Sequence, residues 1–386
     1  MTIDHTAGSS RLLRSINESA ALKLLLERGP LTRGDLRELT GLAKPTTSDV
    51  MRRLQDAGLA KVVGRTSGGP GPNAEIYAVN PDAAYGAAVS LRADDGSLAT
   101  SVCDLTGAVR ARTETVVRST VEHTDPVAAV GDAVQAACRQ ARIPLRRLDH
   151  VQLGVPGSYH ERAEVIRYVD VPGWSRPGLV GEIRTRLRTE VSVDNDVNLA
   201  AIAERNRGIA ADADSFALLW LGEEGLGLAI DLGGTLLRGA RGGAGEIGYM
   251  PVGLPTDRQA RDYHDLVSGA SIRDLAAQHG IQADTGHAAV AAAVASGAGA
   301  FLTELATRIA VGLAAVVAVL DPPLVVLAGE VGQAGGADLH EAVGTALRGL
   351  SVLETAVAST GVTDDAVLLG ALDATLAALR TAVLRR

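Results

Sequence analysis

Two short helical segments joined by a glycine, with two alternating strands directly after them, constrain the fold of this chain most strongly. Thr32 and Asp35, three residues apart, form a capping-box-like helix start, and Gly41 supplies the tight turn that follows this helix. Pro45 opens the second of the two helices, because proline is tolerated in a first helical turn. The pattern predicts a helix–turn–helix near the beginning of a chain that has room for two further domains.

Further elements are expected on both sides of this pair. Apolar residues recur at helical spacing over residues 11–27, and a Gly-Pro pair ends the pattern. Residues 59–63 and 75–79 alternate as two strands, and the glycine- and proline-rich residues 65–72 form the tip between them. A helix–turn–helix followed by such a wing places a helix in the DNA major groove. The alternative is a three-helix packing module that binds no nucleic acid.

The helix that begins near Pro45 is the expected reading helix. Val50, Leu54 and Ala57 are expected to face the core, which leaves the polar side chains for DNA. Small hydroxyl side chains can reach the edges of the bases, whereas arginines bind the phosphate backbone of the DNA. Asp49 repels phosphate, so we expect it to accept from a cytosine amino group or to point away. The expected DNA contacts are Lys44, Thr46, Thr47, Ser48, Arg52, Arg53, Lys61 and Arg65.

Charge is spread unevenly over the 386 residues, whose formal net charge is −8. Residues 1–80 contain 11 Lys or Arg against 8 Asp or Glu, a net charge of +3, and the remainder carries −11. A mildly basic N-terminal segment on an otherwise acidic chain is consistent with a segment that binds phosphate groups.

The composition also indicates in which compartment of the cell the protein is expected. The densest apolar run, residues 309–320, is shorter than the roughly 20 residues that span a bilayer, so we expect no membrane partner. The beginning of the sequence has no apolar signal segment. Cys103 and Cys138 are the only cysteines, which excludes a disulfide framework and a thiolate zinc cluster. We therefore expect a cytoplasmic protein.

After residue 80 the pattern changes to alternating strands and helices. A helix is expected over residues 126–141, and a last helix from about residue 366 carries a leucine stripe. Two successive α/β units with a cleft between them are the expected result. The strands are expected over residues 86–91, 99–104, 150–155, 216–221 and 324–329.

Several short motifs in this region resemble, in order and spacing, those of the ROK family (repressors, open reading frames, kinases). The N-terminal segment resembles the winged helix of the regulator branch, so the resemblance covers nearly the whole chain. It implies an α/β fold: a winged helix–turn–helix over residues 1–80 and a two-lobed, actin-like (ribonuclease H-like) effector-binding and oligomerisation domain over residues 81–386. The lobes divide near residues 196–200, and the last helix returns to the first lobe. The motifs are residues 154–157, 171–174, 194–198, 245–252 and 320–322.

The resemblance implies a set of ligand contacts. In family kinases the Asp of an Asn-Asp pair takes the proton from the sugar hydroxyl, and Asp196 matches it. The family's Gly-Glu-Ile-Gly-His motif contributes a Glu that accepts from sugar hydroxyls, and Glu246 matches it. Tyr249 replaces the zinc-binding His of that motif, and no cysteine follows, so no metal is expected. His264 is either a ligand contact or a surface histidine. The expected ligand contacts are Gly157, Asn195, Asp196, Glu246, Tyr249 and His264.

The departures from the family pattern concern the nucleotide. Acidic residues occupy all three loops that hold ATP in family kinases, at residues 92–96, 222–227 and 328–331. The resemblance therefore implies no cofactor and no catalytic residue, with Asp196 left as a residual base position. Residues 231–235 spell the kinase phosphate motif in the second unit, and we interpret them as a hairpin turn.

These observations predict a DNA-binding transcriptional regulator, a repressor, whose kinase-like domain senses a sugar or related small molecule without catalysis. Its partners would be double-stranded DNA, the effector, and further copies in a homodimer or homotetramer. Two alternatives stay open: an active sugar kinase with a fused DNA-binding head, and a regulator that needs no ligand.

Overall fold

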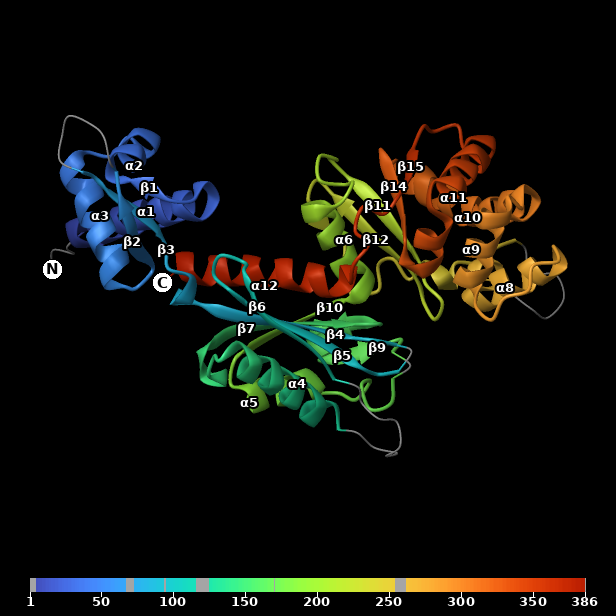
Figure 1. Cartoon of the computed structure of the whole chain (residues 1–386), viewed down its shortest axis with the longest axis horizontal. Coiled ribbons are helices and arrows are strands. Elements are labelled where there is room, and N and C mark those ends of the chain that lie inside the picture. Colours follow the sequence, from blue (N-terminus) through green and yellow to red (C-terminus); the bar gives the residue numbers. More distant parts are fainter. Residues whose placement is uncertain are drawn as a thin grey trace.

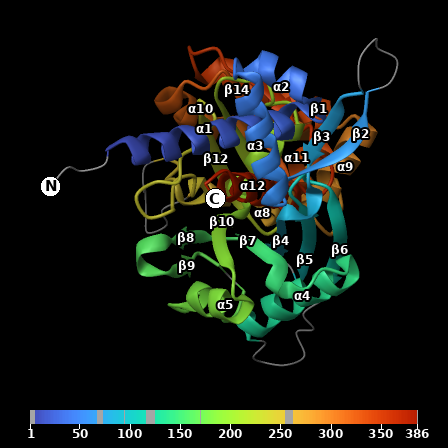
Figure 2. The same cartoon turned by 90° about the vertical axis from the view of Figure 1, so that its left-hand side faces the viewer.

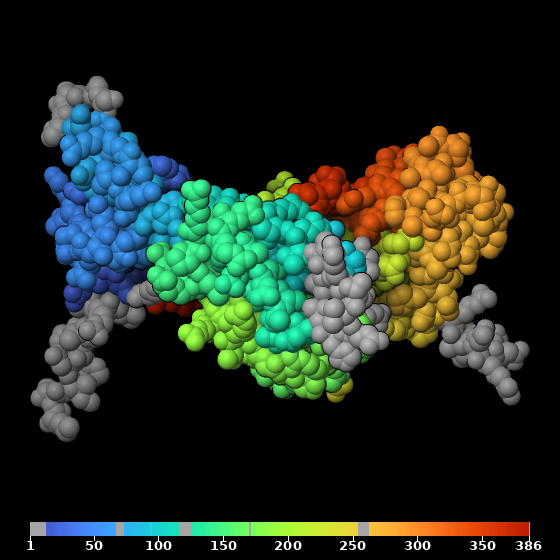
Figure 3. Space-filling view, turned by 60° about the horizontal axis from the view of Figure 1, so that its bottom comes forward, coloured from blue at the N-terminus to red at the C-terminus, as the bar shows by residue number. Residues whose placement is uncertain are grey.

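The computed structural model describes residues 5–66, 73–93, 95–115, 125–169, 171–253 and 262–385. Asp94 and most of the predicted wing tip, residues 67–72, lie outside these residues. Figure 1 shows a head at the N-terminal end, a first lobe beside it and a second lobe at the far end. The space-filling view shows the same three masses in a row (Figure 3).

The head is a winged helix–turn–helix, as predicted. The capping box of Thr32 and Asp35 is present, and Gly41 ends its helix at φ 69°. A short additional strand completes an antiparallel sheet of order β1-β3-β2. The head elements are α1 (His5–Arg28), β1 (Leu31–Thr32), α2 (Arg33–Thr40), α3 (Lys44–Asp56), β2 (Ala60–Arg65) and β3 (Glu75–Val79).

The buried face of α3 differs from the prediction at two positions. Thr47 is only 3% exposed, and its hydroxyl donates to the Ala43 carbonyl at 3.2 Å. The expectation that Thr47 faces DNA is therefore wrong, because position 47 lies one turn before the buried Val50 and Met51 on the same helix face. Ala57 is exposed because it caps the end of α3 instead of packing beneath it.

The first lobe is built on a sheet of order β10-β7-β4-β5-β6. Helices α4 and α5 bury one face of this sheet, and α12 packs against β4, β5 and β7. A small hairpin follows β7 at the end that faces the second lobe. The elements are β4 (Tyr85–Leu91), β5 (Leu98–Asp104), β6 (Val109–Thr115), α4 (Pro126–Ala141), β7 (Leu148–Val155), β8 (Ser158–His160), β9 (Val165–Arg167), α5 (Leu179–Leu187) and β10 (Glu190–Asn195).

The second lobe repeats this architecture with a sheet of order β13-β12-β11-β14-β15. Strand β14 lies in the predicted segment and is parallel to both of its neighbours. The interpretation of residues 231–235 as a turn is confirmed, because Gly233 and Gly234 join β12 to β13 at φ 61° and 79°. The elements are β11 (Phe216–Leu221), β12 (Leu226–Leu232), β13 (Thr235–Leu236), α7 (His264–Val267), α8 (Gly269–Gln278), α9 (Gly286–Ser296), α10 (Gly299–Leu320), β14 (Leu324–Ala328), α11 (Gly329–Leu350) and β15 (Ala356–Ser359).

Helices α6 (Asp196–Arg207) and α12 (Ala366–Leu384) pack side by side where the lobes meet. Helix α12 runs from the lobe junction to the head (Figure 1), and the turned view shows it nearly end-on behind the head (Figure 2). There the Ser19 hydroxyl donates to the Leu384 carbonyl at 3.0 Å. Apolar residues of α1 and α12 belong to one continuous core cluster, so the head packs against the body.

Helices α10 and α12 are long and apolar enough to cross a membrane by length and composition, with mean hydropathies of 1.8 and 1.7. The uninterrupted apolar runs within them are shorter, because Glu304 and Arg308 interrupt α10 and Asp373 and Arg380 interrupt α12. Both helices supply buried side chains to the cores of the lobes, including Leu313 of α10 and Leu372 of α12. Buried core helices pass the same composition test.

Candidate functional site

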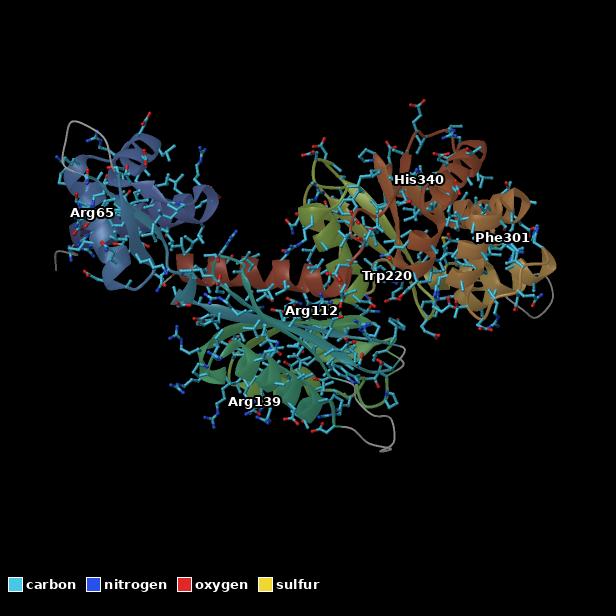
Figure 4. The ribbon with its side chains drawn as sticks, in the orientation of Figure 1. Arg65, Arg112, Arg139, Trp220, Phe301 and His340 are labelled. Atoms are coloured by element: carbon cyan, nitrogen blue, oxygen red, sulfur yellow. The ribbon has the colours of Figure 1, made fainter. Side chains whose placement is uncertain are left out.

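A cleft of about 700 Å³ lies between the two lobes. All six predicted ligand contacts line it, although they come from both lobes and are up to about 100 residues apart in the sequence. Figure 4 labels two further lining residues, Arg112 on the first lobe and Trp220 on the second.

Asn195 organises the junction between β10 and α6. Its side-chain oxygen accepts hydrogen bonds from the backbone N–H groups of Val197 at 2.9 Å and Asn198 at 3.2 Å, which caps α6. Its amide nitrogen donates to the Gly157 carbonyl at 3.2 Å. Asn195 therefore positions both the start of α6 and the loop after β7.

Asp196, the first residue of α6, faces the cleft. Its carboxylate accepts a hydrogen bond from the Val197 N–H at 2.8 Å. Burial and, to a smaller extent, the negative charges of Glu246 and Glu330 together raise its pKa to about 7. A carboxyl with this pKa can accept a proton from a hydroxyl, or orient the hydroxyl, near neutral pH.

Glu246 connects the lobes. It precedes the 3₁₀ turn η4 (Ile247–Tyr249) of the second lobe, and its carboxylate accepts a hydrogen bond from the Ser158 hydroxyl on β8 of the first lobe. A ligand hydroxyl that donates to Glu246 would compete with Ser158. Sequence reasoning missed Ser158, since nothing in a lone serine marks its partner 88 residues away.

Tyr249 and His264 lie together on the second lobe. Their ring centroids are 5.3 Å apart in an edge-to-face arrangement, and Tyr249 is 56% exposed. His264 begins α7 and contacts another cleft residue, so it is not an isolated surface histidine.

The acidic residues in the loops that correspond to the nucleotide loops of family kinases have defined positions. Glu223 accepts hydrogen bonds from the N–H groups of Gly286 at 2.9 Å and His287 at 3.2 Å, at the N-terminus of α9. Burial opposes its charge, but these bonds and the His287 side chain lower its pKa below the usual value. A carboxylate thus already occupies an anion-binding helix end. Asp95 turns back to accept from the Ser97 N–H at 2.7 Å.

The cleft is acidic as a whole. Both guanidiniums that line it, Arg92 and Arg112, form ion pairs with Asp365, at 3.5 and 3.4 Å. Four lining carboxylates have no cationic partner among the described residues: Asp196, Glu224, Glu246 and Glu330. A phosphate group in the cleft would meet net repulsion.

On α3, the helix expected to read DNA, Asp49 forms ion pairs with two arginines of the same helix. It pairs with Arg52 at 2.5 Å and with Arg53 at 2.9 Å. Hydrogen bonds from these two arginines lower the pKa of Asp49 below its usual value. Arg52 also pairs with Asp56 at 3.0 Å, so much of the arginine charge is compensated within the helix.

The other predicted DNA contacts differ in exposure and pairing. Lys44 at the start of α3 and Lys61 on β2 are exposed and form no ion pair within the part of the head that the structure describes. Arg65 is exposed and lies 3.9 Å from Glu75. Thr46 and Ser48, in the first turns of α3, are partly exposed. Except for Thr47, the DNA contacts stay predictions.

The family model of the ROK family matches residues 96–377. The chain belongs to the ROK family. The fold of the whole chain is similar to that of a solved ROK family transcriptional regulator, a homologue of the Escherichia coli MLC protein. The two structures match over 97% of this chain and 98% of the regulator, with a TM-score of 0.75 at 20% identity. This likeness establishes the fold of head and body together.

Relatives of known description include both regulators and a kinase. The transcriptional dual regulator NagC of Escherichia coli is 25% identical over 64% of this chain and 59% of its own length, so the match spans less than two thirds of NagC. The xylose repressor of Bacillus subtilis is 21% identical over 70% of this chain and 76% of its own. A ROK glucokinase of Streptomyces griseus, solved with glucose and AMPPNP, covers 75% of this chain and 98% of its own with a TM-score of 0.59 at 22% identity.

Proposed function

We propose that this ROK protein is a DNA-binding transcriptional repressor whose kinase-like body senses a sugar or related small molecule and does not phosphorylate it. The observation that carries the proposal is the combination of a winged helix–turn–helix with a cleft lined by Asn195, Asp196 and Glu246. The descriptions of NagC and of the xylose repressor support the regulatory part.

The acidic loops support the loss of phosphoryl transfer. Glu223 holds the N-terminus of α9 with its own carboxylate, and Glu330 and Glu224 add charge without a cationic partner among the described residues. A nucleotide would have to displace one carboxylate and approach two others, and each close contact between like charges is unfavourable in a partly buried cleft.

Helix α12 provides a route from the cleft to the head. Its N-cap, Asp365, lines the cleft, and Leu384 at its other end accepts a hydrogen bond from Ser19 of α1. A ligand that closes the lobes would move α12 and so shift the head. In a homodimer this shift would change the spacing of two reading helices on a pseudo-palindromic site, about 34 Å or a multiple of it.

The direct test is fluorescence-anisotropy titration of purified protein on DNA from upstream of its own gene at rising salt. We expect specific binding that weakens steeply with salt, and release on addition of one member of a sugar panel. Absent or salt-insensitive binding would contradict the DNA assignment. A melting-temperature shift with a sugar that Glu246→Ala removes would separate a ligand-dependent regulator from a ligand-independent one.

A second candidate function is an active sugar kinase with a fused head. The position and raised pKa of Asp196 favour it, because such a carboxyl suits a general base near neutral pH. A coupled assay with ATP and the same sugars distinguishes the two. Turnover that Asp196→Asn abolishes would establish the kinase and overturn the non-catalytic proposal.

A further inference from the structure

Tyr168, which sequence reasoning did not select, has an unusual backbone. Five non-glycine residues in the described part of the chain have positive φ, and four of them, such as Arg142 and Asp321, cap helix ends. Tyr168 directly follows strand β9 with φ 58°. A bulky aromatic residue in this conformation is strained, and such strain persists where the surroundings impose it, often at ligand sites.

Close packing against Gly157 accounts for the strain. A Cβ at position 157 would lie 2.5 Å from the Arg167 carbonyl oxygen and 3.2 Å from the Cβ of Val169. The residues on both sides of Tyr168 are therefore pressed against the loop after β7, and Asn195 holds that loop through the Gly157 carbonyl. The Tyr168 side chain is left 55% exposed on the cleft wall.

The ring of Tyr168 meets an aromatic pair from the other lobe. Its centroid is 5.6 Å from that of Tyr249, and Tyr249 in turn contacts His264. Gly248 permits this second contact, because a Cβ there would overlap the His264 ring. The close approach at Gly157 and Gly248 thus accompanies the contacts among the three rings, which come from both lobes. All three rings line the cleft.

We propose that Tyr168, Tyr249 and His264 form an aromatic subsite at the rim of the cleft, which takes the C–H face of an unphosphorylated sugar ring. This inference rests on the proposed sensor function. The faces of aromatic rings carry partial negative charge and attract weakly positive C–H groups, while the sugar hydroxyls can donate to Glu246 and Asp196.

The charge of the cleft selects the ligand class. Four lining carboxylates have no cationic partner within the described residues, and both lining arginines are already paired with Asp365. A phosphate ester would be repelled, whereas a neutral or amine-bearing sugar would not. The same charge favours an amine-bearing ring, because an ammonium group is attracted both to carboxylates and to aromatic faces.

Trp220 offers a reporter for the test. It lines the cleft, and the only other tryptophan, Trp174, is 4% exposed in the first-lobe core, so the Trp174→Phe protein has one reporter in the cleft. This protein is titrated with D-glucose, D-xylose, D-glucosamine and N-acetyl-D-glucosamine, and with the 6-phosphates of the three hexoses. We expect a saturable change in Trp220 fluorescence with at least one unphosphorylated sugar. A hexose that binds should bind at least about 10-fold more tightly than its own 6-phosphate, and xylose at least about 10-fold more tightly than all three 6-phosphates.

Variants at position 168 separate binding from folding. Tyr168→Ala and Tyr168→Gly are expected to weaken the sugar about 10-fold or more, and Tyr168→Phe to retain the affinity. Tyr168→Gly should melt at a higher temperature than Tyr168→Ala, because glycine relieves the positive φ. The fully exposed Val352→Ala on the second lobe serves as the unaffected control.

The outcomes distinguish the two proposals. Sugar binding that Glu246→Ala removes but Tyr168→Ala leaves unchanged would overturn the aromatic subsite and keep the sensor. Preference for a 6-phosphate would overturn the ligand class. No response to any sugar, by fluorescence or by melting temperature, would overturn the sensor and the subsite together.

Discussion

Arg238 of the second lobe and Asp194 of the first form an ion pair at 2.6 Å across the lobe junction. The Asp194 side chain is only 11% exposed and also accepts hydrogen bonds from the Asn195 N–H and the Asn198 side chain, each at 3.0 Å. Together with the bond from Ser158 to Glu246, this pair holds the lobes in the observed relative position.

Replacing Arg238 by alanine should loosen the lobes. The variant leaves a largely buried carboxylate without its cation, which we expect to lower the free energy of unfolding by about 1–3 kcal/mol. Small-angle X-ray scattering should give a larger radius of gyration. Arg273→Ala is the matched control, because Arg273 is comparably exposed and, among the residues that the structure describes, pairs only with the adjacent Asp274. Equal effects of the two variants would contradict a role in lobe closure.

Replacing Asp49 by asparagine should strengthen binding to DNA. The substitution removes the carboxylate that both Arg52 and Arg53 contact. Each arginine then keeps one other carboxylate, Asp56 at 3.0 Å and Glu18 at 3.7 Å, so more of their charge is available to phosphates. We expect tighter binding and a salt slope steeper by about 1 to 2. Anisotropy titrations from low to high salt measure both. Asp284→Asn in the second lobe is the control, and an unchanged slope for Asp49→Asn would disprove this account.

The lysines of the head should contribute more to DNA affinity than Arg52. Lys44 and Lys61 are exposed and unpaired within the described residues, whereas Arg52 already contacts two carboxylates. We expect each Lys→Ala variant to reduce the salt slope by about 1, and Arg52→Ala to reduce it by less. A larger loss for Arg52→Ala in the same titration would reverse this order.

Stability should depend on the titration of Asp196. Its pKa is about 7 in the folded chain and 3.8 ordinarily, so the folded chain keeps a proton that the unfolded chain loses. The free energy of unfolding therefore carries a component that is full below about pH 4 and falls until about pH 7. Between pH 5 and pH 8, we expect this component to lower the free energy of unfolding by on the order of 2 kcal/mol. The Asp196→Asn variant should lack this decrease. Urea unfolding at pH 5 and pH 8 measures it, and identical pH differences in both proteins would refute the assignment.

Most elements could be predicted from local pattern. Helix α4 and strand β11 begin and end at the predicted residues, because proline, charge and apolar runs mark their boundaries within a few positions. The error at Thr47 has the same local origin. A threonine among lysine, serine and arginine looks like a surface residue, but the helix period places it beside Val50 and Met51.

The site divides in a similar way. Asn195, Asp196 and Glu246 could be selected from sequence because each belongs to a short motif of fixed spacing. Three further residues could not be selected, because their contacts are with residues of the other lobe. They are Ser158, Tyr168 and Arg238.

By itself, the sequence determined the winged head, the two α/β lobes and the acidic residues in the loops that match the nucleotide loops of family kinases, since capping, periodicity and residue type act over a few neighbours. Only the tertiary structure decided how those groups are paired. Asp49 compensates two arginines, and Glu223 caps α9. Gly157 allows the segment around Tyr168 to pack against the loop after β7, and the ring of Tyr168 lies 5.6 Å from that of Tyr249. Hydrogen bonds, ion pairs and ring contacts depend on distances of a few ångströms, which most of these groups reach only when distant segments pack together.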